Sequence, residues 1–362
     1  MSTQPTAVVV SDSAGFGGSE LYLATLASEL RARWRFVALL GDRAPTETRR
    51  RLSEAGAEIR VVPGLRRIPD ARAVASLVRA LRRINPQVAH VNLTDQGDGA
   101  GPLLACRLAR CRTVATLHLV IPGRAAWREL ISRHTLRLPH AVIGVSSFVA
   151  AWAEGAGARA RPVLNGVSPS EQTPGARGLL GLPAEALVVG GIGRLDVQKG
   201  WDVLCRAARI VRNELPDVLF AVIGDGPEAP TLREAEACRE VRFLGYREGA
   251  STLLAAFDIL VVPSRYEAFG MVAAEAMLAG VPVVATNVGG LLEVVGEGGV
   301  VVPPESPEHL AAAIVALIRD PAARHAAVEP ARRRARSLFS TQRMADETAD
   351  IYASVAGNGA VA

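Results

Sequence analysis

The feature that most constrains the fold is an alternation of short apolar runs with amphipathic helical patterns, which runs through the first half of the 362 residues and then restarts. Short apolar runs bounded by turn residues are typical of buried strands. Strand–helix–strand alternation predicts a parallel sheet with helices on both faces. The predicted strands are Ala7–Val10, Phe36–Leu40, Glu58–Val62, Val88–Val91, Thr113–Leu117 and Ala141–Val145, then Leu187–Ile192, Leu219–Ile223, Val241–Leu244, Ile259–Val262, Val281–Ala285 and Gly299–Val302.

Amphipathic patterns between these runs predict helices, of which Glu20–Arg31 and Ala71–Ile84 are the clearest early examples. In the second of them five apolar residues share one face and four arginines mostly face away. This pattern suits a helix that covers a sheet better than one that lies on a membrane. The apolar residues are Val74, Leu77, Val78, Leu81 and Ile84, and the arginines are Arg72, Arg79, Arg82 and Arg83.

A Pro-, Gly- and Ser-rich stretch, Ser168–Gly181, separates the two series and is interpreted as a linker. The predicted fold class is therefore α/β, with two doubly wound Rossmann-like domains, residues 1–170 and 171–340. In such sheets ligands bind at the carboxyl ends of the strands, so we expect both domains to face a central cleft.

Charge is distributed unevenly between the predicted domains. Residues 1–170 carry 23 Arg against 12 acidic residues, a balance of +11, and the remainder carries 18 Lys and Arg against 24 acidic residues, a balance of −6. A basic domain suits an anionic acceptor or a membrane surface, although ordinary solvated surface charge is the favoured interpretation. Lys199 is the only lysine of the chain, which draws attention to the loop that carries it.

The four cysteines form no C-x-x-C pair and have no partner histidines at metal-ligand spacing. We therefore expect a reduced, cytoplasmic protein without a structural metal. No apolar run approaches the roughly 18 residues of a membrane-spanning helix, and residues 1–10 lack the basic region of a signal peptide.

Several common enzyme motifs are absent. Glu20 and Asp196 stand where the third glycine of a dinucleotide-binding fingerprint is required. The run Gly144-Val145-Ser146-Ser147-Phe148 is not a G-x-S-x-G nucleophile elbow. Nicotinamide, flavin and serine-hydrolase chemistry are therefore disfavoured.

The first positive signal is the loop Gly193-Arg194-Leu195-Asp196-Val197-Gln198-Lys199-Gly200, directly after a predicted strand. An arginine and a lysine on a glycine-bounded loop at a strand's end can converge on a diphosphate. An ordinary charged surface turn is the alternative, and the position of the only lysine favours a functional loop.

The second signal is the run Pro263-Ser264-Arg265-Tyr266-Glu267-Ala268-Phe269-Gly270, followed by a predicted helix that contains Glu275. If Gly270 precedes the helix, Glu267 lies on the loop and Glu275 on the helix, with the helix N-terminus between them. Two carboxylates could then accept hydrogen bonds from sugar and ribose hydroxyls while the helix dipole meets a diphosphate.

Two further strand-to-loop junctions are weaker signals: Gly224-Asp225-Gly226-Pro227 and Phe243-Leu244-Gly245-Tyr246. For each of them an ordinary turn and a site that contacts the nucleotide base are equally supported.

With these motifs the chain resembles the retaining family 4 glycosyltransferases over nearly its whole length. The family's Glu-x7-Glu motif is matched by Glu267 and Glu275, its G-R-L…K-G loop by Arg194 and Lys199, and its Gly-Gly-x-Glu entry by Gly17, Gly18 and Glu20. Asn165-Gly166-Val167, the G-D-G-P turn and Gly289-Gly290 with Glu293 match further family motifs, and His118 matches a histidine that contacts the transferred sugar.

The resemblance implies a GT-B fold, in which the C-terminal segment, about 341–362, returns to the first domain. It also implies a retaining, metal-independent hexosyl transfer from a nucleotide-diphosphate sugar, with no cofactor and no enzyme nucleophile. The implied catalytic residues are His118, Arg194, Lys199 and Glu267. The implied donor-binding residues are Gly17, Gly18, Gly193, Gly224, Asp225, Gly245, Tyr246, Ala268, Phe269, Gly270, Met271 and Glu275.

The expected partners are a UDP- or GDP-linked sugar and a small-molecule acceptor, with a role in specialised metabolism, and no nucleic acid. Acceptor-side candidates are Phe16, Glu20, Thr94 and Asp95, the last two on a loop that could equally be a surface turn. Three alternatives remain open: a monotopic enzyme acting on a lipid-linked or phosphoinositide acceptor, another GT-B enzyme such as a nucleotide-sugar epimerase, and a non-catalytic sugar-nucleotide-binding protein.

Overall fold

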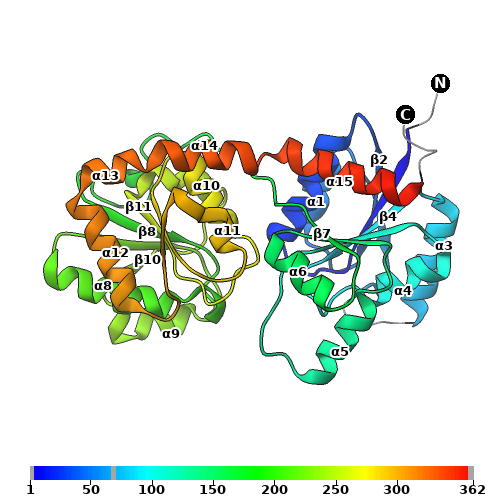
Figure 1. Ribbon diagram of the computed structural model, residues 1–362, viewed down its shortest axis with the longest axis horizontal. Coiled ribbons are helices and arrows are strands. Elements are labelled where there is room, and N and C mark those ends of the chain that lie inside the picture. Colours follow the sequence, from blue (N-terminus) through cyan, green and yellow to red (C-terminus); the bar gives the residue numbers. More distant parts are fainter. Residues whose placement is uncertain (1–3, 67–70, 358–362) are drawn as a thin grey trace. The chain divides into compact units, whose positions relative to one another are not determined.

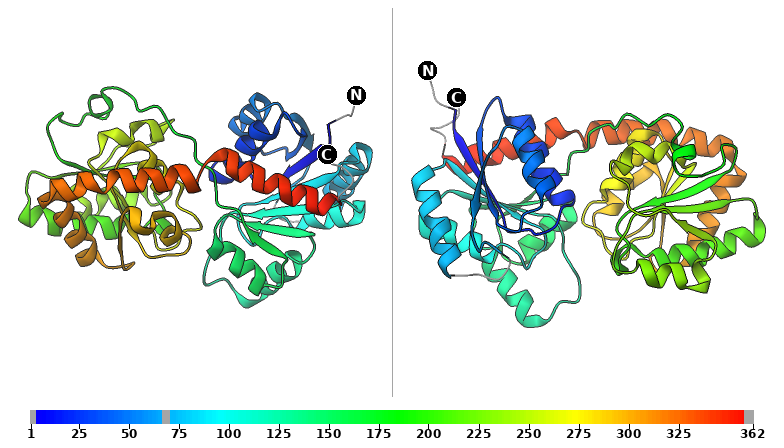
Figure 2. Two further views of the ribbon diagram at one scale, coloured as in Figure 1. Left: turned by 45° about the horizontal axis from the view of Figure 1, so that its top comes forward. Right: turned by 180° about the vertical axis from the view of Figure 1, so that it is seen from behind.

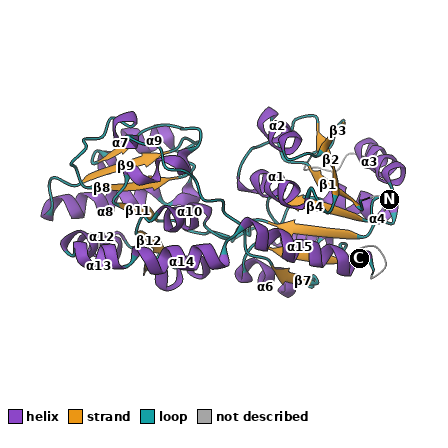
Figure 3. Cartoon of the chain, turned by 90° about the horizontal axis from the view of Figure 1, so that it is seen from above, coloured by secondary structure: helices purple, strands orange, loops and turns teal. Residues whose placement is uncertain are grey.

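The computed structural model describes residues 4–66 and 71–357. The chain forms two compact units, Met1–Gly166 with Thr341–Ala362, and Val167–Ser340, which we call unit 1 and unit 2. The division falls inside the Asn165-Gly166-Val167 motif, four residues before the boundary expected from the sequence. In each unit helices lie on both sides of a parallel sheet (Figure 1, Figure 2 and Figure 3).

Unit 1 contains a seven-stranded sheet in the order β3-β2-β1-β4-β5-β6-β7, with every registered pair parallel. Its strands are β1 Thr6–Ser11, β2 Arg35–Gly41, β3 Glu58–Val62, β4 Val88–Leu93, β5 Thr113–Leu117, β6 Ala141–Gly144 and β7 Ala160–Pro162. Its helices are α1 Gly18–Leu30, α2 Thr46–Glu54, α3 Ala71–Ile84, α4 Ala100–Ala109, α5 Ala126–Thr135, α6 Ser147–Gly155 and α15 Thr341–Ala356.

Unit 2 contains a six-stranded parallel sheet in the order β10-β9-β8-β11-β12-β13. Its strands are β8 Val188–Ile192, β9 Leu219–Ile223, β10 Val241–Phe243, β11 Ile259–Val262, β12 Val283–Thr286 and β13 Val300–Val302. Its α-helices are α7 Ala176–Leu179, α8 Trp201–Glu214, α9 Ala229–Glu234, α10 Met271–Ala279, α11 Leu291–Val295, α12 Pro307–Arg319, α13 Pro321–Ala326 and α14 Val328–Leu338, and its 3-10 helices are η1 Val197–Lys199, η2 Glu236–Cys238, η3 Ala250–Ala256 and η4 Gly296–Gly298.

Both sheets have the strand order of a doubly wound Rossmann-like fold, which confirms the predicted fold class. The order reverses between β1 and β4 in unit 1 and between β8 and β11 in unit 2. Loops that leave the carboxyl ends of these strands diverge to opposite faces, and the crevice between them is where such folds bind ligands. Lys199 follows β8 and Glu267 follows β11, so the two residues flank this position in unit 2.

The stretch expected to be a linker, Ser168–Gly181, is instead packed onto unit 2. The amide of Thr173 donates to the carbonyl of Thr252 over 2.8 Å, and its hydroxyl donates to the hydroxyl of Thr252 over 2.9 Å. Arg177 donates to Asp258 over 2.8 Å and to three backbone carbonyls. Polar composition misled the prediction, because these polar groups bind protein partners and not solvent.

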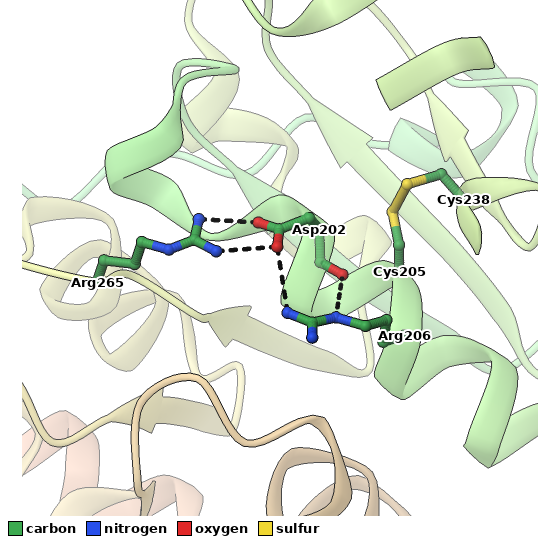
Figure 4. Close-up of a disulfide and its surroundings, with 5 residues drawn as sticks. All are labelled: Asp202, Cys205, Arg206, Cys238 and Arg265. Carbon is green, nitrogen blue, oxygen red and sulfur yellow. Dashed lines mark hydrogen bonds and ion pairs between the residues drawn. A yellow bond between two sulfur atoms is a disulfide. The ribbon is translucent and has the colours of Figure 1, made fainter. Parts of the chain in front are cut away.

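The expectation that all four cysteines are reduced is wrong, because Cys205 of α8 and Cys238 of η2 form a disulfide (Figure 4). Their separation of 33 residues gives no sequence motif, and only the fold brings them together. Cys106 and Cys111 are free thiols. Within residues 4–66 and 71–357, no helix has the length and apolar character needed to cross a membrane.

Candidate active site

In unit 2, the loop after β8 is fixed by its neighbours at the same sheet edge. The amide of Gly193 donates to the carbonyl of Ile223 and that of Leu195 to the carbonyl of Asp225, each over 3.0 Å. A Cβ on Gly224 would lie 1.9 Å from the carbonyl oxygen of Gly193, so only glycine allows this approach. The G-R-L and G-D-G motifs are therefore one structural element built from two loops.

The loop returns to the sheet at Gly200, where φ is +66° and a Cβ would meet the carbonyl oxygen of Pro263 at 2.2 Å. The side chain of Asp196 accepts a hydrogen bond from the amide of Lys199 and so caps η1. Arg265 adds two parallel hydrogen bonds to Asp202 at the start of α8, of 2.8 and 2.9 Å (Figure 4). The loops after β8 and β11 are therefore held together on both sides of Lys199.

This arrangement brings together Lys199 and Glu267, which the sequence separates by 68 positions. The Lys199 ammonium Nζ lies 2.6 Å from Glu267 Oε2, and the two side chains are 21% and 11% exposed. The Ser264 hydroxyl donates to the same carboxylate oxygen over 3.2 Å. The ammonium is therefore held in a fixed place at the strand ends while it still reaches solvent.

The side chain of Arg194 is more exposed and less constrained than that of Lys199. Its side chain is 70% exposed, and its Nε lies 3.7 Å from a carboxylate oxygen of Asp196. Its backbone is nevertheless anchored, since the indole N–H of Trp201 donates to the Arg194 carbonyl over 2.8 Å. The guanidinium can therefore swing toward a ligand from a fixed base.

Gly270 directly precedes helix α10. Its φ of +99° suits glycine, and no side chain caps the N-terminus of the helix. The positive end of the helix dipole is thus available to an anion. Of the neighbouring predicted donor residues, Ala268 and Phe269 are buried, and the Phe269 ring packs edge-on against Phe339 with centroids 5.3 Å apart. Only the backbone of these two residues can serve a ligand, whereas Met271 is partly exposed.

Glu275 lies one turn along α10 in a half-buried position. Across the part of the chain that the structure describes, no hydrogen bond or ion pair to its carboxylate is found. Burial raises its pKa to about 7. A carboxylate in this state gains from any ligand that donates hydrogen bonds to it.

The remaining predicted donor residues of unit 2 lie on adjacent loops at the same edge. The amide of Gly224 donates to the carbonyl of Gly245 over 2.9 Å, which joins the loops after β9 and β10. Asp225 and Tyr246 are exposed, and the Tyr246 side chain is 67% exposed. The amide of Gly290 donates to the Glu267 carbonyl over 3.0 Å, so the Gly289-Gly290 loop supports the backbone of Glu267.

In unit 1, Glu20, an expected acceptor-side residue, is hydrogen-bonded at the start of α1. Its carboxylate Oε2 accepts from the amide of Gly17 over 3.0 Å and from the hydroxyl of Ser19 over 2.8 Å. The side chain is 2% exposed, and burial raises its pKa. Glu20 therefore fixes the N-terminus of α1, whereas Phe16, Gly17 and Gly18 are exposed.

His118 follows β5, and its ring nitrogen Nε2 lies 2.7 Å from the amide oxygen Oδ1 of Asn92 at the end of β4. The Asn92 amide nitrogen donates to the Ser19 carbonyl over 3.3 Å. An amide oxygen only accepts, so Nε2 of His118 carries the proton and Nδ1 is left as an acceptor. Burial, with a smaller effect from His90, lowers the His118 pKa to about 3, so the ring is neutral near pH 7.

Asn92 begins the stretch Asn92–Gly101 that was expected to contribute to acceptor specificity, but its contact with His118 was not foreseen, because an asparagine near the end of an apolar strand matches no motif. The His118 ring also packs edge-on against Tyr22, with centroids 4.8 Å apart. Three elements, α1, β4 and β5, therefore position this histidine.

The expected acceptor loop Thr94–Gly99 is held inside unit 1. Asp95 is buried and forms a 2.6 Å ion pair with Arg124, and Thr94 is half-buried. The Gln96 side chain exchanges two hydrogen bonds with the backbone of Ile121, of 2.8 and 3.0 Å. This loop therefore shapes the segment after His118, and the Asp95 side chain is already engaged.

No group of three or more His, Cys, Asp or Glu side chains among residues 4–66 and 71–357 is arranged to hold a metal ion.

Two family models match the chain. The model described as Glycosyltransferase Family 4 matches residues 16–171, which include Glu20 and His118. The model described as Glycosyl transferases group 1 matches residues 186–320, which include Lys199, Glu267 and Glu275. The chain belongs to the family 4 glycosyltransferases.

Curated relatives of the chain agree with this family. The chain is 38% identical over 178 residues to the glycogen synthase of Mycobacterium tuberculosis, a match of 47% of this chain and 42% of the relative. It is 36% identical over 220 residues to the D-inositol 3-phosphate glycosyltransferase of Corynebacterium urealyticum, a match of 55% of this chain and 52% of the relative. The matched parts thus span about half the length of these relatives.

Among solved structures, the chain is similar to Anabaena Alr3699/HepE in complex with UDP-glucose. The TM-score is 0.83 at 25% sequence identity, and the match covers 96% of this chain and 99% of that one. The likeness, with two Rossmann-like units in one chain, confirms the GT-B fold class.

Proposed function

We propose that this glycosyltransferase transfers a hexose-type sugar from a nucleotide-diphosphate donor to a small-molecule acceptor, with retention of anomeric configuration and without a metal ion. The observation that carries the proposal is the cluster at the switch point of unit 2. There a fixed ammonium, a carboxylate and an uncapped helix N-terminus meet at the ends of neighbouring strands.

The difficult step of such a transfer is the departure of a nucleoside diphosphate, which accumulates negative charge as the glycosidic bond breaks. Lys199 and the N-terminus of α10 would stabilise that charge from fixed positions, and Arg194 would close over it. Preorganised charges act most strongly where charge develops in the transition state. They would supply the stabilisation that a divalent cation provides in other enzymes.

Glu267 would have two roles in this site. Its ion pair with Lys199 keeps the ammonium in place, and its carboxylate oxygens can accept hydrogen bonds from hydroxyls of the transferred sugar. Glu275 would accept from the ribose hydroxyls of the donor, which explains an unpartnered carboxylate on the helix that also meets the diphosphate.

His118 would act as a neutral hydrogen-bonding group. Asn92 fixes its tautomer, so Nδ1 can accept a hydrogen bond from a sugar hydroxyl and no positive charge is introduced beside the reacting sugar. The diphosphate oxygen itself would take the proton of the acceptor hydroxyl, because front-face attack requires no enzyme nucleophile.

The solved complex of Anabaena Alr3699/HepE with UDP-glucose favours a UDP-linked donor, and GDP-linked sugars are the next choice. One relative is named a D-inositol 3-phosphate glycosyltransferase, and we accordingly propose a polar small molecule as the acceptor.

Calorimetric titration and donor hydrolysis with a panel of UDP-, GDP-, ADP- and dTDP-sugars, each in excess EDTA, test the proposal. One sugar nucleotide is expected to bind and to turn over without added metal. Lys199→Ala is expected to lower kcat by about 10²–10³-fold, while Arg239→Ala, an exposed arginine of the same unit, leaves it unchanged. Lack of binding by every donor, or strict dependence on Mg²⁺ or Mn²⁺, contradicts the proposal.

Analysis of the reaction product distinguishes a glycosyltransferase from a nucleotide-sugar epimerase. A transferase requires an acceptor, and NMR of its product is expected to show the donor's anomeric configuration. An altered sugar nucleotide formed without any acceptor would favour the epimerase.

A further inference from the structure

Helix α5 of unit 1 exposes an apolar face. Trp127, Leu130 and Ile131 are 59%, 57% and 51% exposed, and Ser132 is the one residue within the helix that is buried. Residues spaced by three and four positions lie on one face of a helix, so the three side chains form a single patch. Helix α3 differs, because its apolar residues Val74, Leu77, Val78 and Leu81 are buried against unit 1.

A second apolar area lies on α3 and α4, which lie side by side (Figure 1). The crossovers β3-α3-β4, β4-α4-β5 and β5-α5-β6 all advance in one direction across the sheet, so right-handed connections place these three helices on the same face. Leu104 and Leu108 of α4 are 42% and 50% exposed. With Val74 and Val78 they line an open groove of about 710 Å³.

This face, which we call the α3–α4–α5 face, is also strongly cationic. Helices α3, α4 and α5 contain seven arginines and one acidic residue, Glu129. Arg79 and Arg82 line the apolar groove, and the Arg128 guanidinium lies 5.1 Å from the centre of the Trp127 ring.

Apolar side chains interspersed with charges of one sign identify the kind of occupant. Tryptophan and arginine are also enriched in protein–protein interfaces, so a protein partner, a second copy of the chain included, is the alternative that the experiment below has to exclude. A tryptophan beside arginines on an otherwise exposed helix is the composition of helices that lie at the headgroup level of a bilayer, where anionic lipids attract the cations. We infer that the α3–α4–α5 face binds the surface of an anionic bilayer, with Trp127, Leu130 and Ile131 of α5 inserted at its interface.

The inference is independent of the proposed function, because none of the residues that carry it is among the candidate catalytic, donor-binding or acceptor-side residues. The helix that would contact a membrane also differs from the one that the sequence suggested, which was α3. The arginine-studded α3 covers the sheet with its apolar residues, and the unpartnered apolar side chains are on α4 and α5.

Co-sedimentation of the full chain with vesicles tests the inference. Vesicles of phosphatidylglycerol and phosphatidylcholine in equal parts are compared with phosphatidylcholine alone, at low and high salt. The wild-type chain is expected to bind the anionic vesicles and to lose binding as salt rises. A Trp127→Ser, Leu130→Gln, Ile131→Gln variant is expected to bind at least about tenfold more weakly.

Leu179→Gln is the matched control, because Leu179 of α7 is 65% exposed and lies in unit 2. It should bind vesicles like the wild type. Arg128→Ala with Arg133→Ala should weaken binding to anionic vesicles, and Arg239→Ala should not. The triple variant is expected to keep the wild-type unfolding temperature, since its three side chains are exposed in the native state.

Three results would overturn the inference: no binding of the wild type to anionic vesicles, equal binding by the triple variant, or equal binding to both vesicle types at all salt concentrations. Light scattering provides a fourth. If the wild type is a dimer that the triple variant dissociates, the face is a contact between two copies of the chain and not a membrane surface.

Discussion

The burial of the Glu275 carboxylate lowers the free energy of unfolding. Burial raises the pKa of its carboxyl to about 7 from a reference value of 4.5. The folded state therefore binds the proton more tightly than the unfolded state, and the free energy of unfolding falls as pH rises from about 4.5 to about 7 and is level above that. The ionised form at pH 8 costs up to about 3 kcal/mol relative to a neutral side chain.

Glu275→Gln is accordingly expected to be more stable than the wild type at pH 8 and to lose this advantage near pH 5. Denaturant unfolding at several pH values measures the difference. Glu234→Gln, on the exposed side of α9, is the control and should show no pH-dependent gain. A stability difference that does not grow between pH 5 and pH 8 would show that Glu275 ionises normally.

The same variant should bind the donor more weakly, because glutamine presents a single amide oxygen to the ribose hydroxyls. Increased stability together with reduced binding would identify Glu275 as a residue kept for ligand recognition at a cost in stability. Calorimetric titration of the preferred sugar nucleotide into wild type and variant at pH 8 makes this comparison.

Among the elements of unit 2, the disulfide joins α8 to η2, on the segment that directly follows Lys199 and Gly200. Closing a loop of this length restricts the unfolded chain and stabilises the native state by about 2–4 kcal/mol. Cys238→Ser, or reduction of the wild type, is therefore expected to lower the unfolding temperature of unit 2. Cys111→Ser should unfold like the wild type, since Cys111 is a free thiol.

Thiol titration of the unfolded, unreduced chain gives a direct check. Two reactive thiols, from Cys106 and Cys111, are expected. Four thiols would mean that Cys205 and Cys238 do not pair, and the stability prediction would fail with them.

Elements also show how much the sequence could predict. Strands β3, β5, β9 and β11 have the predicted bounds, since each is an apolar run ended by polar or turn residues. β7, Ala160–Pro162, was missed because it is short, ends in proline and has two exposed residues. Apolar periodicity detects only elements that bury a face.

Some residues of the candidate site could also be predicted from the sequence and others could not. Residues that the family motifs contain, such as Lys199 and Glu267, could be named from the sequence, and their 2.6 Å contact follows from the strand order around the switch point. The contact of Asn92 with His118 and the disulfide could not be predicted, because each joins elements distant in the sequence. The capping role of Glu20 is local, since its carboxylate binds the amide of Gly17 three residues earlier, and the sequence motif alone did not distinguish it from a ligand-binding role.

At the scale of the whole molecule, the chain leaves unit 1 after Gly166 and returns to it at Thr341. The returning helix α15 contributes five side chains to the unit 1 core: Met344, Ala345, Ala349, Ile351 and Tyr352. The Tyr352 hydroxyl and His90 Nδ1 lie 2.5 Å apart in the buried interior, and His90 Nε2 lies 2.8 Å from the Thr116 hydroxyl. Unit 1 is therefore incomplete without a segment that follows all of unit 2.

Truncation after Ser340 is expected to unfold unit 1 and to leave unit 2 folded. It removes five core side chains and leaves the buried His90 without a partner at Nδ1, and burial already lowers the His90 pKa to about 3. Hydrogen exchange followed by mass spectrometry should show lost protection across β1, β4 and β5 and unchanged protection across β8, β9 and β11. Donor binding should persist and sugar transfer should disappear.

Tyr352→Phe separates the loss of the hydroxyl from the loss of the helix. It keeps the ring against Trp34 and removes one hydrogen bond from a buried group, which costs about 1–3 kcal/mol. Unit 1 alone should open more readily in this variant, and transfer should fall only near its lowered unfolding temperature. If truncation instead left unit 1 protected, or unfolded both units together, α15 would not be the element that completes unit 1.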